Sequence, residues 1–333
     1  MVFQFQRLII LGLVTWFFVG VLSDHECETP YEVEALPESY AHLGEGPHWD
    51  VATQNLFMVD IEAGKLKRFD YKLNKIYECQ IENETFASFV IPIDGFTDQF
   101  AVGIGHRIAS VKWDGISKTC KVDRTLLTVE ESREYETNRF NDAKCDPRNR
   151  LYAGTMQQNR TGGSTGNLYK VTKLNSYDLL IKDLKISNGL AFDENAKKLY
   201  HIDSKKYNVM SYDYDINNGE IKNPKVVFEL SGYGDNVVPD GMTIDSEGFL
   251  YAAINGGSAV FKIDPKNGHV LLKIMIPAKQ VTSAAFGGPN LNILYVTTSD
   301  ETSPSGRSQA FKVTGLGSKG LPMKNVKLEN FNI

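Results

Sequence analysis

One short pattern recurs in this chain. A first residue, usually polar, is followed five positions later by a second residue, and a β-like run comes next. Four copies carry a carboxylate or amide side chain at the first position, and two weaker copies carry neither. The six positions, about 43–52 residues apart, are Glu45, Phe89, Asn141, Asn188, Asp240 and Ser283. If these residues open the innermost strands of a circular fold, two carboxylates and two carboxamides converge on one axis. Such oxygen ligands suit Ca²⁺, Mg²⁺ or Mn²⁺, so the pattern predicts a cation site.

A purely structural interpretation of the same pattern is that each copy is a β-turn, because Asp-Gly and Asn-Gly are common turn dipeptides. The second residue of the pattern fits this interpretation, since it keeps its identity in Asp50, Asp146, Asp193 and Asp245. The first residue varies from Glu to Phe to Asn to Asp, which a turn does not require. We therefore assign the four aspartates to turns and the first residues to function.

The elements that must position these residues are short β-runs bounded by Gly, Asp, Asn and Pro. Expected strands follow the six copies at 56–60, 65–69, 100–104, 108–113, 151–156, 167–171, 199–203, 208–214, 250–254, 259–263, 293–298 and 310–313. One unit alone leaves a hydrophobic sheet face bare, so the units must stack. The sequence predicts an all-β fold, a six-bladed β-propeller with a metal site at one end of the central channel, in a single domain over 24–333. Residues 130–138 are expected to be a loop or a single turn.

The N-terminus has the features of a secretory signal. Arg7 precedes an apolar run over 8–22, which is short for a membrane-spanning helix. We expect a signal peptide over 1–23, a secreted protein and no membrane association after cleavage. Cys27, Cys79, Cys120 and Cys145 then allow three disulfide pairings, which the sequence does not distinguish. Sequons begin at Asn83 and Asn159.

Other chemistries find little support. The net charge of −5 and the absence of a basic run argue against a nucleic-acid partner. The chain has no nucleophile-elbow, zinc-helix or phosphate-loop motif. His42 and His48 flank Glu45, and we expect structural roles for both.

Several motifs together resemble the SMP-30/gluconolactonase family, in particular its regucalcin and luciferin-regenerating members. They are Gly44-Glu45-Gly46-Pro47-His48-Trp49-Asp50, Asn138-Arg139-Phe140-Asn141-Asp142, Gly154-Thr155-Met156, Ser187-Asn188-Gly189-Leu190, Pro239-Asp240-Gly241, Phe286-Gly287-Gly288-Pro289-Asn290 and Val313-Thr314-Gly315-Leu316-Gly317. The resemblance implies a six-bladed propeller with one divalent cation, Ca²⁺ in first place and Zn²⁺, Mn²⁺ or Mg²⁺ as alternatives.

Matched motif by motif, the resemblance implies that Glu45, Asn188 and Asp240 bind the metal ion and that Arg139 and Asn141 bind substrate. A glutamate that contacts substrate in regucalcins is replaced here by Asn159. The expected function is metal-dependent hydrolysis of a small lactone or ester, such as gluconolactone, by a monomer, with Asp240 as general base. Two alternatives stay open: a luciferin-regenerating type of hydrolase acting on a heterocyclic substrate, and a calcium- or ligand-binding propeller without catalysis.

Overall fold

The structure is a computed structural model that describes residues 31–159, 163–234, 236–300 and 307–327. Regular structure in these residues is almost entirely β. Helical conformation within them is confined to the 3₁₀ turns η1 (Ile61–Ala63), η2 (Arg133–Tyr135) and η3 (Ser204–Lys206). The all-β prediction is confirmed, and residues 130–138 contain a single turn. The expected signal segment 1–23 and Cys27 lie outside the described residues. Within these residues, no helix has the length and apolar character needed to cross a bilayer.

The strands follow one another in groups of four, and each group is an antiparallel meander. The first group is β2 (Gly44–Asp50), β3 (Asn55–Asp60), β4 (Lys65–Asp70) and β5 (Lys75–Ile81). The second is β6 (Val90–Pro92), β7 (Gln99–Ile104), β8 (Arg107–Lys112) and β9 (Thr119–Thr128). The third is β10 (Asn138–Cys145), β11 (Leu151–Gln157), β12 (Gly166–Lys173) and β13 (Ser176–Leu184). All the middle strands expected in these groups are present within one or two residues.

The second half of the chain repeats this arrangement. The fourth group is β14 (Ser187–Asp193), β15 (Lys198–Asp203), β16 (Asn208–Tyr214) and β17 (Ile221–Glu229). The fifth is β18 (Val238–Ile244), β19 (Leu250–Asn255), β20 (Ala259–Asp264) and β21 (His269–Met275). The sixth has β22 (Gln280–Gly287), β23 (Ile293–Ser299) and β24 (Phe311–Thr314), and its fourth strand comes from the other end of the chain as β1 (Glu32–Ala35).

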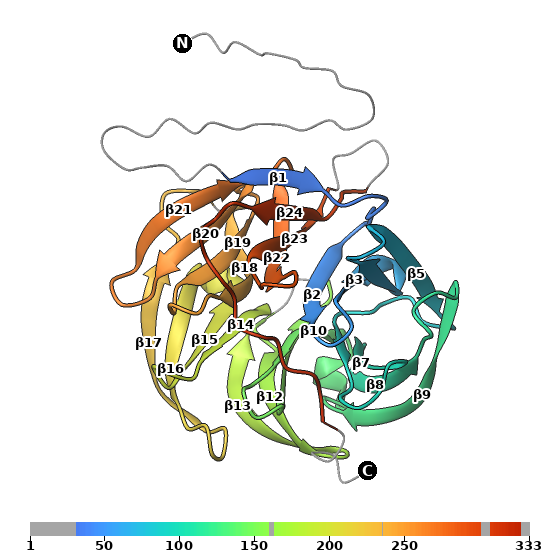
Figure 1. Cartoon of the computed structure of the whole chain (residues 1–333). Coiled ribbons are helices and arrows are strands. Elements are labelled where there is room, and N and C mark those ends of the chain that lie inside the picture. The colour runs from blue at the N-terminus through green and yellow to red at the C-terminus, as the bar shows by residue number, and fades with distance from the viewer. Residues whose placement is uncertain (1–30, 160–162, 235, 301–306, 328–333) are drawn as a thin grey trace, which may run out of the picture.

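The groups are arranged around a common centre, with the first strand of each group innermost (Figure 1). β3 is buried along its whole length, whereas most residues of the fourth strands β13 and β17 are exposed or half-buried. Neighbouring first strands are joined by side chains: Thr282 Oγ1 in β22 donates to the Gly44 carbonyl in β2 over 2.6 Å. Ser88 Oγ, just before β6, donates to the Phe140 carbonyl in β10 over 2.5 Å. The architecture is therefore propeller-like.

Hydrophobic cores lie between neighbouring groups. Six clusters of buried side chains connect each group to the next and the sixth to the first. At the junction of the sixth and first groups, Trp49 stacks on Tyr295 with ring centroids 5.5 Å apart. At the next junction, Phe57 and Phe100 lie 4.9 Å apart. Burial of these aromatic side chains supplies the main driving force for closing the circle.

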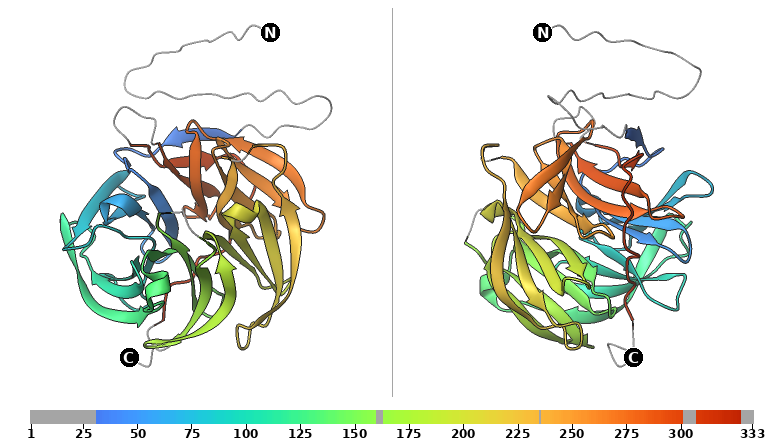
Figure 2. Two further views of the ribbon diagram at one scale, coloured as in Figure 1. Left: turned by 180° about the vertical axis from the view of Figure 1, so that it is seen from behind. Right: turned by 60° about the vertical axis from the view of Figure 1, so that its left-hand side comes forward.

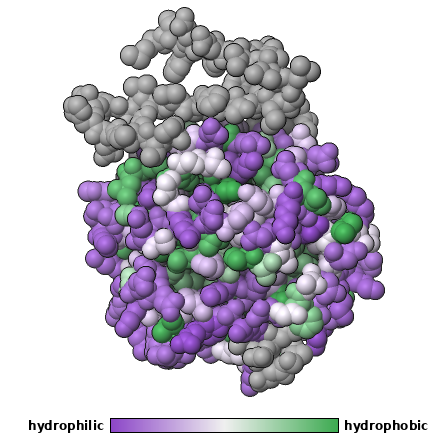
Figure 3. Space-filling view, in the orientation of Figure 1, coloured by the Kyte–Doolittle hydropathy of each residue, from purple (hydrophilic) through white to green (hydrophobic). Residues whose placement is uncertain are grey.

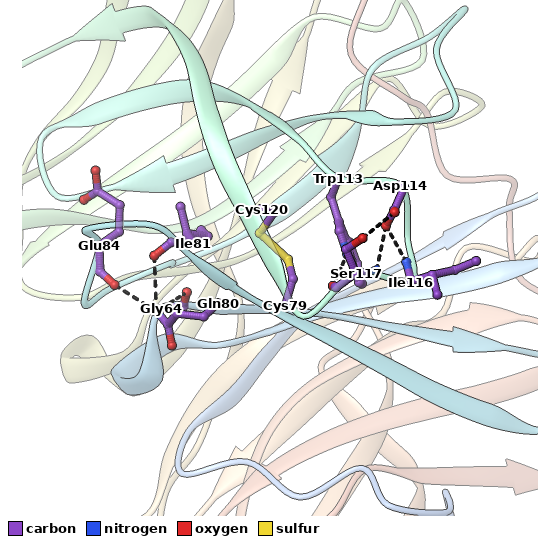
Figure 4. The surroundings of a disulfide bond; sticks show 10 residues. All are labelled: Gly64, Cys79, Gln80, Ile81, Glu84, Trp113, Asp114, Ile116, Ser117 and Cys120. Atoms are coloured by element: carbon purple, nitrogen blue, oxygen red, sulfur yellow. Dashed lines mark hydrogen bonds between the residues drawn. A yellow bond between two sulfur atoms is a disulfide. The ribbon is translucent and has the colours of Figure 1, made fainter.

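A disulfide joins the outer edges of the first two groups. Cys79 in β5 and Cys120 in β9 are bonded, with Cα atoms 5.8 Å apart (Figure 4). Beside the bond, Gln80 Nε2 donates to the Glu84 carbonyl over 3.0 Å (Figure 4). Cys145 is buried with a free thiol. Of the pairings that the sequence left open, the structure therefore contains the one that joins Cys79 to Cys120.

The C-terminal segment 315–327, which we call the C-terminal strap, crosses one end of the molecule. Its Lys319 carbonyl accepts a hydrogen bond from the Ser246 amide over 2.7 Å. Farther along, Asn325 Oδ1 lies 3.0 Å from His48 Nε2. The backbone of Val326 forms hydrogen bonds with the backbone of Pro92, in β6, and of Asp94, just after it. The strap runs in front of the centre in Figure 1 and behind it in the left view of Figure 2. The surface on this side is mostly hydrophilic, with small separate hydrophobic areas (Figure 3).

Candidate functional site

The first residues of the repeated pattern lie at irregularities in the innermost strands. In five of the six first strands, the pairing register with the second strand shifts where this residue lies. The shifts fall between Glu45 and His48, Phe140 and Ala143, Ser187 and Leu190, Pro239 and Met242, and Val281 and Ser283. A β-bulge bends the strand and changes the direction of a side chain. The bulges explain how the side chain of one residue per strand departs from the regular alternation between the two faces of the sheet.

The three expected metal ligands are buried, and protein groups fix each of them. Glu45, Asn188 and Asp240 are exposed by 8%, 5% and 8%, respectively. Glu45 Oε2 accepts the Gly46 amide over 2.7 Å. Asn188 Nδ2 donates a hydrogen bond of 2.8 Å to the hydroxyl of Ser204, the first residue of η3. Asp240 Oδ2 accepts a hydrogen bond of 2.9 Å from the side-chain amide of Asn255, the last residue of β19. Their orientations are therefore set before any ligand arrives.

The buried carboxylates of this region influence one another's charge. Burial raises the pKa of Glu45 well above its usual range, and the nearby carboxylates of Asp240 and Asp142 raise this pKa further. The Gly46 amide and the Arg139 guanidinium act in the opposite direction. Burial also raises the pKa of Asp142. Like charges in a low dielectric favour protonation, and a bound cation reverses that preference.

The donor set fits a hard divalent cation. No group of three or more His, Cys, Asp and Glu side chains in the described part of the chain is arranged to hold a metal ion. The candidate set instead combines two carboxylates with the Asn188 amide oxygen. Carboxylate and amide oxygens are ligands of Ca²⁺, Mg²⁺ and Mn²⁺, whereas thiolate or multiple imidazoles are absent from this set. The buried negative charge of Glu45 and Asp240 is what such an ion would offset.

The two expected substrate-binding residues adjoin this set. Arg139 Nη1 donates to Asn141 Oδ1 over 2.7 Å and to the Phe140 carbonyl over 2.8 Å. Asn141 Nδ2 donates in turn to Asn188 Oδ1 over 3.0 Å. A continuous chain of hydrogen bonds therefore runs from the guanidinium to an expected metal ligand. Arg139 and Asn141 are exposed by only 5% and 8%, so both are held rigidly.

Gln158, which sequence reasoning missed, contacts this chain of hydrogen bonds. Its Oε1 accepts a hydrogen bond from Arg139 Nε. The expected substrate residue Asn159 follows it in an exposed turn after β11. Asn159, where the family resemblance led us to expect Glu, therefore falls next to a residue that contacts the guanidinium. The local motif Gly154-Thr155-Met156 pointed to this turn, and the sequence analysis assigned the role there to Asn159 and not to Gln158.

Further residues near the site also escaped the sequence analysis. Asn255 Nδ2 is the donor to Asp240 Oδ2, and Ser204 Oγ is the acceptor from Asn188. Asp142 and Lys144 lie within electrostatic reach of Glu45. Asp142 directly follows a register residue in the sequence, which was the one available signal. Asn255 and Ser204 come from a second strand and a connection, and Lys144 lies later in a first strand, at positions that the repeated pattern does not mark.

The aspartates assigned to turns do form turns. Oxygen atoms of their side chains accept backbone amides two to four residues ahead, at Asp50, Asp146, Asp193 and Asp245. His48 is buried and bonded to the C-terminal strap, and burial lowers its pKa to about 4. His42 donates its backbone amide to Asp60 over 3.0 Å. These contacts agree with the structural roles expected for them.

A cavity of about 400 Å³ lies beside the site at the end of the molecule opposite the strap. Its walls include Phe86, Ile104 and Gly105, together with the ion pair between Arg107 and Glu84. The Gly105 carbonyl accepts a hydrogen bond of 2.8 Å from the backbone amide of Phe140, the residue between Arg139 and Asn141. The cavity wall is therefore one residue away from the expected substrate-binding pair.

Comparisons with known proteins agree with this picture. The model of the SMP-30/gluconolactonase/LRE-like region matches residues 43–300. Bovine regucalcin (Bos taurus) is 32% identical over 302 residues, which cover 87% of this chain and 97% of that protein. A luciferin-regenerating enzyme structure has a TM-score of 0.82 at 36% identity, covering 90% of this chain and all of the other. Regucalcin from Agrobacterium tumefaciens, a calcium-binding protein, has a TM-score of 0.76 at 22% identity, covering 87% and 96%. This last likeness supports the fold alone.

Proposed function

Because the chain belongs to the SMP-30/gluconolactonase family, we propose that it is a secreted lactone hydrolase that depends on one divalent cation. In this proposal the six groups are the blades of a six-bladed β-propeller, and the cation lies at the open end of its channel. The observation that carries the proposal is the buried oxygen set of Glu45, Asn188 and Asp240, joined by hydrogen bonds to Asn141 and Arg139.

Glu45, Asn188 and Asp240 would hold the cation, with Ca²⁺ as the first candidate. When bound there, it supplies Lewis acidity toward a substrate carbonyl and offsets negative charge that develops during hydrolysis. The buried setting strengthens this electrostatic effect because little water is present to screen it. Zn²⁺, Mn²⁺ and Mg²⁺ are the alternatives to be compared.

Arg139 and Asn141 would bind the substrate. The guanidinium is fixed through Nε by Gln158 and through Nη1 by Asn141, and a guanidinium is a suitable donor to ring or hydroxyl oxygens of a substrate. Asn159 lies close enough along the turn after β11 to be a further candidate. A prepositioned guanidinium orients the lactone without losing much side-chain entropy on binding.

Asp240 would act as the general base for the attacking water. Its Oδ2 accepts a hydrogen bond of 2.9 Å from Asn255 Nδ2, which fixes the orientation of the carboxylate. The Asp240 carboxylate would accept the proton of the water as the oxygen attacks the carbonyl carbon. The ring C–O bond then breaks, and the alkoxide so formed takes up a proton to give the hydroxy acid.

A small lactone such as glucono-δ-lactone is the proposed substrate. The neighbouring cavity of about 400 Å³ favours a second candidate, an ester or heterocycle with an apolar part, because Phe86 and Ile104 line it. Such a volume is at the lower end of the range for ligand pockets. Secretion is supported by the disulfide between Cys79 and Cys120, which is typical of oxidising compartments.

The direct test is hydrolysis of glucono-δ-lactone by metal-stripped protein after Ca²⁺, Zn²⁺, Mn²⁺ or Mg²⁺ is added back, with Asp240→Asn in parallel. The proposal predicts activity that returns with a cation and falls at least about a hundredfold in the variant. Asp193→Asn, which alters a turn carboxylate, is the matched control. Tight cation binding without turnover of any lactone or ester would favour the alternative of a non-catalytic binding protein over the proposed hydrolase.

A further inference from the structure

Lys144 in β10 reaches across the molecule to a first strand that carries one of the expected metal ligands. Its ammonium donates to the Met242 carbonyl in β18 over 2.7 Å. β10 belongs to the third group and β18 to the fifth, and β14 of the fourth group lies between them (Figure 1). The Lys144 side chain therefore ties together strands that are not neighbours, and it ends two residues from Asp240.

The ammonium is within electrostatic reach of two buried carboxylates of the site. Burial lowers the pKa of Lys144, while the carboxylates of Asp142 and Glu45 oppose this shift. In the other direction, the Lys144 charge lowers the pKa of Asp142. One cation thus interacts with both of these acids, and Glu45 is one of the expected metal ligands. A tether to the Met242 carbonyl alone would not require a charge at this place.

We propose that Lys144 is a built-in counter-cation: it stabilises the carboxylate cluster when no metal ion is bound, and by repulsion it limits how tightly a divalent cation binds. This inference rests on the proposed cation site. A site with the same ligands and no ammonium nearby would bind the ion more strongly and would destabilise the protein more when empty. Lys144 is therefore a positioning residue that sets cation affinity.

The size of the effect follows from Coulomb's law. A unit charge about 10 Å from a divalent ion, at an effective dielectric constant of about 20–40, changes its affinity on the order of tenfold or more. Lys144→Met keeps most of the side-chain volume and removes the charge. Lys144→Gln removes the charge and keeps a donor for the Met242 carbonyl. Lys144→Arg keeps the charge.

The test is calorimetric titration of metal-stripped protein with Ca²⁺, combined with thermal unfolding with and without Ca²⁺. We expect Lys144→Met and Lys144→Gln to bind Ca²⁺ about tenfold more tightly than the wild type, and Lys144→Arg to bind within about threefold of it. Without Ca²⁺ the two neutral variants should unfold at a lower temperature, and Ca²⁺ should raise their unfolding temperature by more than that of the wild type.

Lys170→Met is the matched control. Lys170 is buried and, like the half-buried Lys144, donates to a carbonyl, that of Asn218, over 2.8 Å, but it lies in β12 away from Glu45. Its loss should lower stability and leave Ca²⁺ affinity unchanged. Unchanged or weaker Ca²⁺ binding by both neutral Lys144 variants would overturn the inference. Failure of the wild type itself to bind a divalent cation would instead refute the proposed cation site.

Discussion

Asn141 Nδ2 lies 3.0 Å from Asn188 Oδ1. The two residues are 47 positions apart and lie in the first strands of neighbouring groups. Asn141 also accepts from Arg139 over 2.7 Å, so a single amide connects the expected substrate-binding arginine to an expected metal ligand. If Arg139 binds the substrate and Asn188 the cation, as we propose, the two binding events are coupled through Asn141.

Replacement of Asn141 by Ala should impair catalysis more than folding. The substitution removes the Arg139 acceptor and one donor to Asn188, so kcat/KM for glucono-δ-lactone should fall about 10- to 100-fold. Asn55→Ala is the control, because Asn55 is similarly buried and accepts from Arg68 far from the site. The control should lose stability and keep kcat/KM. Equal losses of kcat/KM in the two variants would contradict a role for Asn141.

The turn after β11 offers two amides, and their variants should differ. Gln158→Ala removes the acceptor of Arg139 Nε and should raise KM about 3- to 10-fold. Gln158→Glu keeps the acceptor and should have a KM near that of the wild type. Asn159→Ala tests the residue expected from the family motif. A KM that rises for Asn159→Ala alone would mean that Asn159, and not Gln158, is the functional member of the turn.

His201 should make folding stability depend on pH. It is buried beside Ser187 Oγ, and burial lowers its pKa to about 3. The unfolded chain takes up this proton below about pH 6.5, whereas the folded protein does so only near pH 3. Stability from this group is therefore complete above pH 6.5 and is lost as the pH falls, by about 2–3 kcal/mol at pH 4.5.

Urea unfolding at pH 7 and pH 4.5 measures this loss. His201→Asn should reduce the difference between the two free energies of unfolding by about 2 kcal/mol. His269→Asn removes an exposed imidazole and should leave the wild-type difference intact. If both variants behave like the wild type, His201 is not the group responsible.

Reduction of the disulfide should destabilise the protein without touching the site. Cys79 and Cys120 are separated by 41 residues, for which loop-closure entropy gives about 4 kcal/mol. The free energy of unfolding should fall by up to this amount when a reducing agent is added. The double variant Cys79→Ala/Cys120→Ala should show no such response. A continued response of that variant would reveal a second disulfide.

Asn325 in the C-terminal strap should matter for stability and not for turnover. Asn325 Nδ2 donates to Asp50 Oδ1 over 3.1 Å, and Oδ1 of the same side chain lies 3.0 Å from His48. Asn325→Ala leaves these buried partners unsatisfied, which costs about 1–3 kcal/mol. kcat/KM should stay within about twofold of the wild type because the strap covers the end opposite the site. A large loss of kcat/KM at unchanged stability would contradict this separation.

The repeated pattern was enough to predict most of the fold. The strands after each copy follow from alternation and turn residues, and the Asp residues of the turns follow from local capping, as at Asp146. β1 was not predicted, because residues 32–35 form a strand only by pairing with Phe311–Thr314 at the other end of the chain. Strand pairing over such a distance leaves no local signal.

The site was predictable only where the repeat marks it. Glu45, Asn188 and Asp240 share a register, and the structure places each at a bulge in a first strand. Asn255 and Lys144 are set by contacts between strands and across the molecule, to Asp240 and to the Met242 carbonyl. Such partners depend on three-dimensional proximity, which spacing along the chain does not encode.

The most direct measurement is calorimetric titration of the metal-stripped protein with Ca²⁺ or Mn²⁺, for the wild type, Glu45→Gln, Asp240→Asn and the turn variant Asp193→Asn. The account predicts a single bound ion per wild-type chain and an affinity that falls at least about tenfold in Glu45→Gln and Asp240→Asn. Asp193→Asn should bind like the wild type. Absence of a bound ion, or an affinity that neither Glu45→Gln nor Asp240→Asn changes, would contradict the proposed cation site.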